Sequence, residues 1–244
     1  MNHKLEQFAL DINTVTNSIT HNTKIFSLAH PNSDMRYQAR SEGIIILDGE
    51  TLLCRVSDPK LLSKLEYHYQ DISSQWFGEF ENITKLIEIL KQHNYSITNY
   101  VPYYTKKIPD QNVSMNDIRI IEQDEIHQFK DNPNFKECFI FEDQDPDLFG
   151  VAIEIDKEII AMAGCNQHGK YCAEIGIQVL PEHRGNEYAA QLVNALHALL
   201  AKRRPDLLAL YSTQFTHTNS IKVATKAGFV LDWVEINLKS DSEK

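Results

Sequence analysis

Apolar and polar positions recur along the chain with two different periods, which predicts a mixture of strands and helices. Early in the patterned sequence, apolar runs at 44–47 and 51–56 flank Asp48-Gly49, a residue pair that favours the tight turn of a β-hairpin. A helix is expected to begin at Pro59, because proline suits the first helical position.

The same region continues with apolar residues at helical spacing over 83–93 and with a strand over 96–104. The polar segments before residue 44 are expected to be helical. We therefore predict a small N-terminal α/β module, in which no catalytic motif is recognised. The polar segment 106–116 separates it from the second region. The predicted domains are 1–110 and 116–240, the second ending with a strand over 229–238.

The second region alternates strands and helices more regularly. A short strand precedes a helix that Asp124 is expected to cap. Two strands then flank a turn at 156–157, and Pro181 ends a third strand. A long helix with one apolar stripe ends at Pro205. A second helix, closed by Gly228, lies between the last two strands.

Composition narrows the function classes. The 244 residues include 24 Lys plus Arg and 34 Asp plus Glu, a formal net charge of −10 with histidine neutral. This balance argues against nucleic acid or anionic lipid bound through bulk charge. No apolar run reaches membrane-spanning length, and the first residues lack the apolar core of a signal peptide. We therefore expect a cytoplasmic protein with no nucleic-acid or membrane partner.

The four cysteines form no Cys-x-x-Cys pair, so neither a zinc site nor a redox motif is indicated, and no metal is expected. In a cytoplasmic protein they are expected to be reduced thiols. They are Cys54, Cys138, Cys165 and Cys172.

A strand, a turn through Arg184-Gly185 and a long helix follow one another in IGIQVLPEHRGNEYAAQLV. The free N–H groups of the turn and of the helix N-terminus form an anion site, which the positive end of the helix dipole strengthens. Arg184 can add charge-assisted hydrogen bonds to a phosphate. The chain contains neither GxGxxG nor GxxxxGKS, so dinucleotide and Walker-type loops are poor fits.

Residues from about 118 to 238 resemble the GNAT superfamily of acyl-CoA-dependent N-acyltransferases. The hairpin VAIEIDKEIIAMAG, the strand AEIGIQVLP and the turn-helix EHRGNEYAAQL stand in that family's order. The family's signature is Arg or Gln, two residues, Gly, one residue, then Gly or Ala, and it falls on Arg184 to Ala189. The late NSIKVATKAGF is a second match. The resemblance implies an α/β (α+β) fold with a mixed, mostly antiparallel sheet flanked by helices. The N-terminal module is a candidate degenerate half of the same fold.

The resemblance also implies a cleft between two splayed strands that binds acetyl-CoA as co-substrate. The backbone around Ile177, Gln178 and Val179 would hydrogen-bond the acyl and pantetheine amides. Asn219 would contact the pantetheine arm. The turn that would hold the pyrophosphate comprises Arg184, Gly185, Asn186, Glu187, Tyr188, Ala189 and Ala190.

Two positions depart from the family's pattern. Glu187 occupies the signature's first glycine, where a carboxylate repels pyrophosphate unless its side chain points to solvent. Ala224 stands where many members carry a tyrosine that protonates the leaving thiolate. Tyr211, at the end of the strand LLALYST, is a candidate substitute acid, with simple packing as the alternative.

Glu174 is the candidate general base. By strand alternation it shares a face with Gly176 and Gln178, beside the reacting end of the co-substrate in the implied fold. It would accept the proton of the amine directly or through a water. The alternative is a structural glutamate that hydrogen-bonds neighbouring strands. His168 is expected at the tip of a hairpin.

The sequence therefore predicts an N-acetyltransferase in which an amine attacks the acetyl-CoA thioester directly, without a metal. The acceptor is a small-molecule or peptide amine whose identity stays open, as does a homodimer. Two other classes remain. One is a non-catalytic acyl-CoA sensor or binding module, and the other is an interaction protein that kept the fold and lost the co-substrate.

Overall fold

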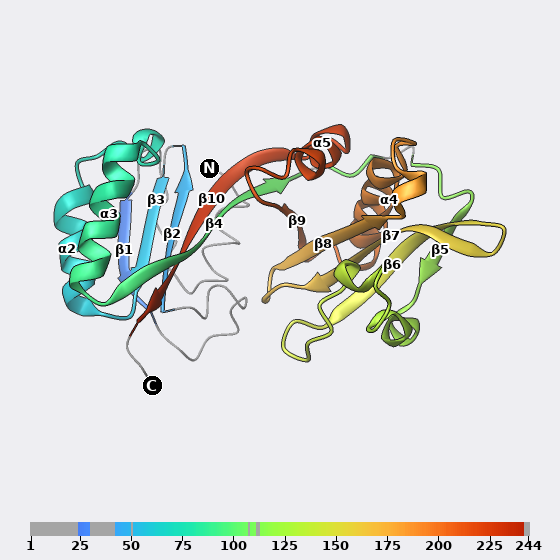
Figure 1. Cartoon of the computed structure of the whole chain (residues 1–244), viewed down its shortest axis with the longest axis horizontal. Helices are drawn as coiled ribbons and strands as arrows, with labels where there is room; N and C mark the ends of the chain where they lie inside the picture. The colour runs from blue at the N-terminus through green and yellow to red at the C-terminus, as the bar shows by residue number, and fades with distance from the viewer. Residues whose placement is uncertain (1–23, 30–41, 50, 107, 111–112, 242–244) are drawn as a thin grey trace. The chain divides into compact units, whose positions relative to one another are not determined.

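The chain folds into two compact units (Figure 1). Unit 1 contains Met1–Tyr103 and Asp232–Lys244, and unit 2 contains Tyr104–Leu231. The chain thus leaves unit 1 once, forms unit 2 and returns to unit 1 near its end. The residues that this computed structural model describes are 24–29, 42–49, 51–106, 108–110 and 113–241.

In the described part of unit 1, a sheet is accompanied by the helices α2 and α3 and by the short 3₁₀ segment η2 (Ser74–Trp76), an α/β arrangement that the sequence pattern predicts. The strands lie in the order β1-β3-β2-β10-β4, and α2 and α3 lie side by side on one face of the sheet (Figure 1). The elements are β1 (Lys24–Leu28), β2 (Gly43–Asp48), β3 (Thr51–Val56), α2 (Pro59–Tyr69), α3 (Phe80–Gln92), β4 (Tyr95–Thr105) and β10 (Val230–Ser240).

Two parts of unit 1 differ from the expectation from sequence. The segments before residue 44 are expected to be helical, and most of them fall outside the described residues. The described part contains β1, which is a strand parallel to β3 and not a helix. The C-terminal strand β10, expected at the end of the second domain, pairs antiparallel with β2 over Val234 to Leu238. This long-range pairing places most of β10 in unit 1.

The helix predicted at Pro59 is confirmed, and its start has a clear local cause. Asp58 adopts an extended conformation, and its carboxylate accepts a hydrogen bond from the Lys60 N–H at 2.8 Å. This bond satisfies one of the free N–H groups at the helix start. Leu61 and Leu65 are then fully buried against the sheet.

Unit 2 contains a mixed, mostly antiparallel sheet, which confirms the predicted fold class. Its strands lie in the order β9-β8-β7-β6-β5, and only the β8–β9 pair is parallel among the described strands of this unit. Helices and short 3₁₀ segments connect or cover these strands. In chain order the elements are β5 (Ile118–Ile121), η3 (Gln123–Phe129), η4 (Lys136–Cys138), β6 (Asp147–Ile155), β7 (Glu158–Gln167), β8 (Cys172–Val179), η5 (Pro181–His183), α4 (Tyr188–Arg203), β9 (Leu208–Ser212) and α5 (Thr218–Lys226).

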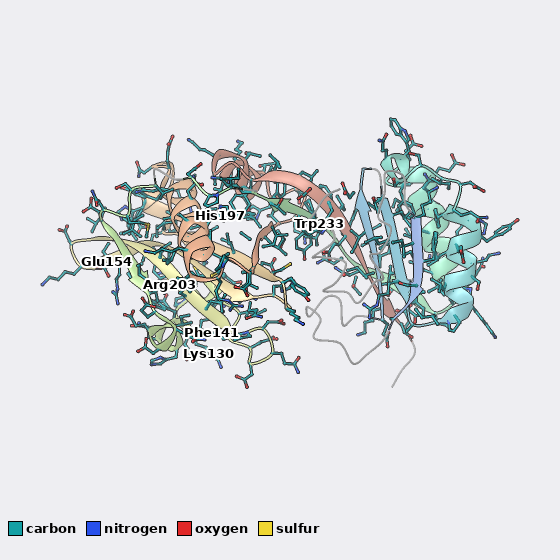
Figure 2. All side chains as sticks on the ribbon, turned by 180° about the vertical axis from the view of Figure 1, so that it is seen from behind. Lys130, Phe141, Glu154, His197, Arg203 and Trp233 are labelled. Atoms are coloured by element: carbon teal, nitrogen blue, oxygen red, sulfur yellow. The ribbon has the colours of Figure 1, made fainter. Side chains whose placement is uncertain are left out.

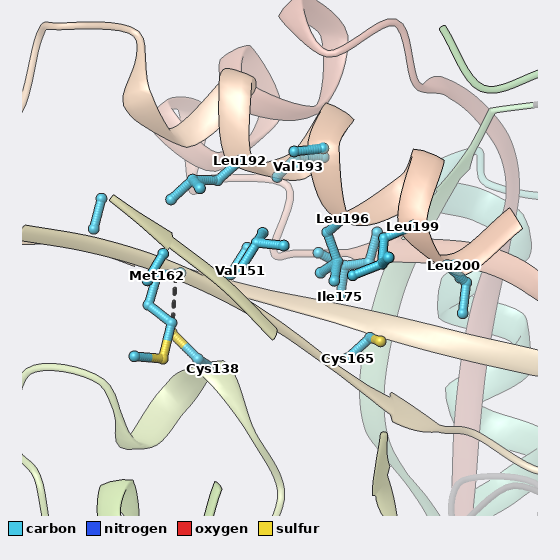
Figure 3. Packing of buried hydrophobic residues seen from close by; sticks show 14 of the residues in the cluster. Cys138, Val151, Met162, Cys165, Ile175, Leu192, Val193, Leu196, Leu199 and Leu200 are labelled. Atoms are coloured by element: carbon cyan, nitrogen blue, oxygen red, sulfur yellow. Dashed lines mark hydrogen bonds between the residues drawn. The ribbon is translucent and has the colours of Figure 1, made fainter. Parts of the chain in front are cut away.

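Helix α4 is anchored by the apolar stripe that the sequence predicts. Figure 3 shows the side chains of this stripe directed toward the strands, where they pack in one cluster with Val151 and Ile175. Burial of one leucine side chain contributes about 1.5–3 kcal/mol, so the stripe fixes the position of the helix on the sheet. The labelled members of the predicted stripe are Leu192, Leu196, Leu199 and Leu200, and Val193 is buried beside them.

The C-terminal end of α4 is held by Arg203, labelled in Figure 2. Its guanidinium lies 5.1 Å from the centroid of the Phe149 ring and donates hydrogen bonds of 2.8 and 2.7 Å to the Glu122 carboxylate. These bonds hold the pKa of Glu122 below its ordinary value.

Glu122 also corrects the expectation that Asp124 caps the helix after β5. The segment is a 3₁₀ helix, and its N-cap is Glu122, whose side chain accepts from the third N–H of the helix. The Glu125 carboxylate accepts the Glu122 N–H in return, at 3.0 Å. This reciprocal capping box leaves no capping role for Asp124.

Three glycines lie opposite one another on adjacent strands, Gly150 on β6, Gly164 on β7 and Gly176 on β8. The segment from Glu137 to Phe139 crosses this row at close range. A Cβ at Gly176 would lie 2.6 Å from the Glu137 carbonyl oxygen, and one at Gly150 would lie 2.9 Å from the Phe139 ring. Only glycine therefore allows the segment to lie against the sheet.

All four cysteines are buried and free, as expected of reduced thiols. The Cys138 thiol donates to the Met162 carbonyl at 3.1 Å, a bond drawn in Figure 3. Burial raises the pKa of Cys138 and of Cys165 to about 12. These thiols are therefore protonated and poor nucleophiles at neutral pH.

The glycine row gives a first prediction. Gly164→Ala should lower the free energy of unfolding by about 1–3 kcal/mol, because its methyl group would overlap the Cys138 carbonyl and the Phe139 ring. Denaturant unfolding measures this change. Gly78→Ala is the control, since its added Cβ would meet only the Tyr100 hydroxyl, at 3.3 Å. Equal stability of Gly164→Ala and the wild-type chain would contradict this packing.

Candidate functional site

The site begins where two neighbouring strands separate. β8 pairs with β7 along its whole length, up to Val179 opposite Ala161. Its parallel pairing with β9, over the described residues, ends at Glu174 opposite Leu210, although β9 continues to Ser212. The backbone of β8 beyond Glu174 therefore has an edge that β9 does not use. Such an edge can hydrogen-bond the amide groups of a ligand.

A cavity of about 740 Å³ lies at this opening. Every residue that the family resemblance assigns to acetyl-CoA lines it, and so does Tyr211. The assigned residues are Ile177, Gln178, Val179, Arg184, Gly185, Asn186, Glu187, Tyr188, Ala189, Ala190 and Asn219. The remaining lining residues are Glu137, His183, His217, Ser220, Lys222, Val223 and Lys226.

The turn before α4 brings backbone N–H groups to this cavity. The Arg184 Nε donates to the Val179 carbonyl at 3.2 Å, which ties the turn to the end of β8. Gly185 has a φ of +89°, a conformation that glycine adopts without strain. No side chain of the described residues caps the first turn of the 16-residue helix. Its free N–H groups and its dipole therefore favour an anion.

Glu187 is the last residue before α4, with a φ of +66° in the left-handed region. Its carboxylate accepts a hydrogen bond from the Lys226 ammonium of α5. The Glu187 side chain is 67% exposed. The structure thus resolves the conflict seen in the sequence, because the carboxylate lies toward solvent and has a cationic partner. Lys222, one turn earlier on α5, also lines the cavity.

A second cavity of about 410 Å³ contains Glu174. It shares Glu137, Ile177, Tyr211, His217 and Ser220 with the first cavity, so the two adjoin. After the roles that the resemblance implies, we call the first the co-substrate cavity and the second the acceptor cavity.

Polar neighbours hold the Glu174 side chain, which is 20% exposed. The Ser212 hydroxyl donates to one of its carboxylate oxygens. The other oxygen lies 3.6 Å from the His168 Nδ1. His168 lies in the loop that joins β7 to β8, as expected of a hairpin residue, yet it is only 1% exposed. Its imidazole is directed toward the candidate base rather than into solvent.

Tyr211 lies where the two cavities adjoin and lines both. Its hydroxyl is 2.9 Å from the Ser220 hydroxyl, and its ring packs 6.2 Å from that of Phe229. Burial raises the pKa of Tyr211, and the hydrogen bond with Ser220 opposes that rise. Ala224 is completely buried in the core. An alanine side chain has no acidic proton, so position 224 offers no acidic group, whereas the Tyr211 phenol does.

Comparison with known proteins identifies the fold around this site. Residues 113–229 match the acetyltransferase (GNAT) family model. These residues form a GNAT acetyltransferase domain. None of the curated proteins matches the chain.

The chain as a whole also has solved structural neighbours. A GCN5-related N-acetyltransferase-like protein from Streptococcus suis is 14% identical, with 82% of this chain and 85% of that chain covered and a TM-score of 0.46. A GNAT-family acetyltransferase from Colwellia psychrerythraea is 15% identical, with 75% of each chain covered and a TM-score of 0.45.

Some residues of the GNAT domain's site escaped the sequence analysis. Lys222 and Lys226 follow Asn219 at helical spacing, so the face of α5 that carries Asn219 could have indicated them. No comparable pattern in the sequence indicated that Glu137 lies at the site. Its backbone N–H donates to the Gln178 side chain at 3.0 Å, across 41 residues of sequence.

Two further properties of the described residues bear on this domain. No group of three or more His, Cys, Asp or Glu side chains among them is placed to hold a metal ion. None of the helices described is long and apolar enough to cross a membrane.

The left-handed conformation at position 187 gives a second prediction. Glu187→Gly and Glu187→Ala both remove the bond to Lys226, but only alanine retains the steric cost of a positive φ. The glycine variant should be more stable than the alanine variant by about 1 kcal/mol, as measured by thermal or denaturant unfolding. Equal stabilities would mean that residue 187 is not left-handed in solution.

Proposed function

We propose that the GNAT domain transfers the acetyl group of acetyl-CoA to an amine, by direct attack of the amine on the thioester. The observation that carries this proposal is the opening between β8 and β9. The free edge of β8 leads there to the uncapped N-terminus of α4, around one cavity. A strand edge suits an arm that contains amides, and a helix N-terminus suits a pyrophosphate.

Residues on three elements would hold acetyl-CoA. The backbone around Gln178 and Val179 would bind the pantetheine amides, and Asn219 would contact the same arm. The turn from Arg184 to Ala190 would bind the pyrophosphate, with Lys222 as an additional cation. Acetyl-CoA would supply an activated acyl group with a thiolate as leaving group.

Glu174 would act as general base. An alkyl ammonium must lose a proton before or during its attack on a carbonyl carbon. The Glu174 carboxylate, oriented by Ser212 and close to His168, would take this proton directly or through a water. Support comes from its location in the wall of the acceptor cavity, next to the co-substrate cavity.

Tyr211 would act as general acid toward the departing thiolate. A phenol is protonated at neutral pH, so a proton is available to transfer, and burial raises the pKa of Tyr211 further and so makes it a weaker acid. Ser220, in contact with the Tyr211 hydroxyl, would orient this group. This assignment supplies the acid that Ala224 cannot.

An acyl-CoA sensor without catalysis is the alternative, and Ala224, which stands where many family members carry an acidic tyrosine, favours it. Calorimetry and a thiol-release assay separate the candidate functions. The proposed enzyme binds acetyl-CoA and releases free CoA when a suitable amine is added. A sensor binds acetyl-CoA and releases no thiol with any amine. An interaction protein does not bind acetyl-CoA even at millimolar concentration.

The role of Glu174 is tested by Glu174→Gln. We expect a loss in kcat of about 100-fold or more at neutral pH, with partial recovery at high pH as the amine deprotonates in solution. The dissociation constant for acetyl-CoA should change little. Glu158→Gln, which removes an exposed carboxylate outside both cavities, is the control. An unchanged rate for Glu174→Gln at every pH would overturn the assignment.

The role of Tyr211 is tested by Tyr211→Phe, which keeps the ring and its packing. We expect kcat to fall by about 10- to 100-fold while acetyl-CoA still binds, because only the proton donor is lost. Unfolding of the variant checks that its stability is preserved. If kcat stays at the wild-type value, Tyr211 serves only in packing.

A further inference from the structure

The acceptor cavity carries an uneven set of charges. Its acidic lining residues are Glu137 and Glu174, and no Lys or Arg lines it among the described residues. The cations of this region, Arg184, Lys222 and Lys226, all line the co-substrate cavity instead. The two adjoining cavities therefore differ in their cations. Three Lys or Arg side chains line the co-substrate cavity, and none of the described ones lines the acceptor cavity.

The rest of the acceptor wall combines apolar and neutral polar side chains with the imidazole of His217. Phe139, Ile140 and Ile175 offer apolar contacts, and Asn166, Thr213 and Ser220 offer neutral polar groups. A volume of about 410 Å³ is in the range of small-molecule sites, for which about 300–1,000 Å³ is typical. Such a wall suits a short carbon chain with an amino group.

A carboxylate on the acceptor would have no lysine or arginine partner among the residues described around this cavity. It would also meet the like charges of Glu137, whose side chain is 69% exposed, and of Glu174, whose side chain is 20% exposed. Like charges repel each other most where water is partly excluded, which applies here to Glu174. An ammonium group, in contrast, gains from both glutamates. Lys136, whose ammonium lies 3.9 Å from the Glu137 carboxylate, does not line the cavity and offsets only part of this effect.

We infer that the acceptor is a small aliphatic amine without a carboxylate, such as a diamine, selected by Glu137 together with Glu174. This inference rests on the proposed acetyl transfer. Glu137 acts as a specificity-determining residue. Its backbone is fixed by the hydrogen bond to Gln178 and by the close approach to Gly176, so its side chain can be changed without moving the segment.

The test compares amines that differ only in a carboxylate. Cadaverine and lysine form one such pair, and histamine and histidine form another. With the full chain and acetyl-CoA, kcat/KM from thiol release should favour cadaverine over lysine by about tenfold or more, a difference of ~1.4 kcal/mol. A peptide with a free amino terminus and an amidated carboxyl terminus is the third substrate.

Glu137→Lys should reduce the preference for cadaverine over lysine by at least about threefold, because it places a cation where the carboxylate would lie. Glu137→Gln should have a smaller effect in the same direction. Glu158→Lys, which makes the same charge change outside both cavities, is the matched control and should keep the wild-type ratio.

Each outcome decides between the inference and its alternatives. Equal or better use of lysine, or a higher kcat/KM for the peptide than for cadaverine, overturns it. An unchanged ratio in Glu137→Lys removes Glu137 from selection. If acetyl-CoA binds and no amine releases thiol, the proposed catalysis fails. Calorimetry with cadaverine and lysine then tests the charge preference directly, and equal affinities overturn it.

Discussion

The end of β8–β9 pairing at Glu174 and Leu210 is the constraint on which the site depends. Backbone N–H and C=O groups of a strand need partners, and the part of β8 beyond Glu174 does not receive them from β9. The connection from β8 to β9 runs through α4, as a parallel crossover requires, so the helix N-terminus lies just beyond the open edge. A strand edge and a helix start therefore meet at one cavity, because both follow from the same separation of strands.

The segment from Glu137 to Phe139 lines the acceptor cavity, and the row of glycines makes room for this segment. Without side chains at Gly150, Gly164 and Gly176, the segment from Glu137 to Phe139 can lie directly on the sheet. Gln178 then fixes this segment by accepting the Glu137 N–H. The same strand thus presents its backbone to the co-substrate cavity and positions a side chain of the acceptor cavity.

Local patterns were sufficient to predict most elements, because hairpin turns, helix starts and apolar stripes depend on neighbouring residues. The turn at Asp48-Gly49 and the stripe of α4 are examples. Contacts between distant segments could not be predicted in this way. The pair Glu187 and Lys226 is separated by 39 residues, and the β10–β2 pairing joins segments from opposite ends of the chain. Periodicity contains no information on such pairings, so the strand order of unit 1 and the partner of Glu187 had to come from the structure.

The net charge of −10 does not show that basic residues gather at one place in this acidic chain. A protein of this charge has no general attraction for an anionic co-substrate, so the attraction must come from groups within a few ångströms. In the proposed function, Arg184, Lys222 and the α4 N-terminus would supply it at one end of the opening. Glu187 lies among these groups, and its carboxylate pairs with Lys226, a second α5 lysine that lines the cavity while both side chains stay more than half exposed. An anion that reaches α4 can then compete for a lysine that is already in place. The substitution of the signature glycine therefore adds a carboxylate that is paired with a cation at the site.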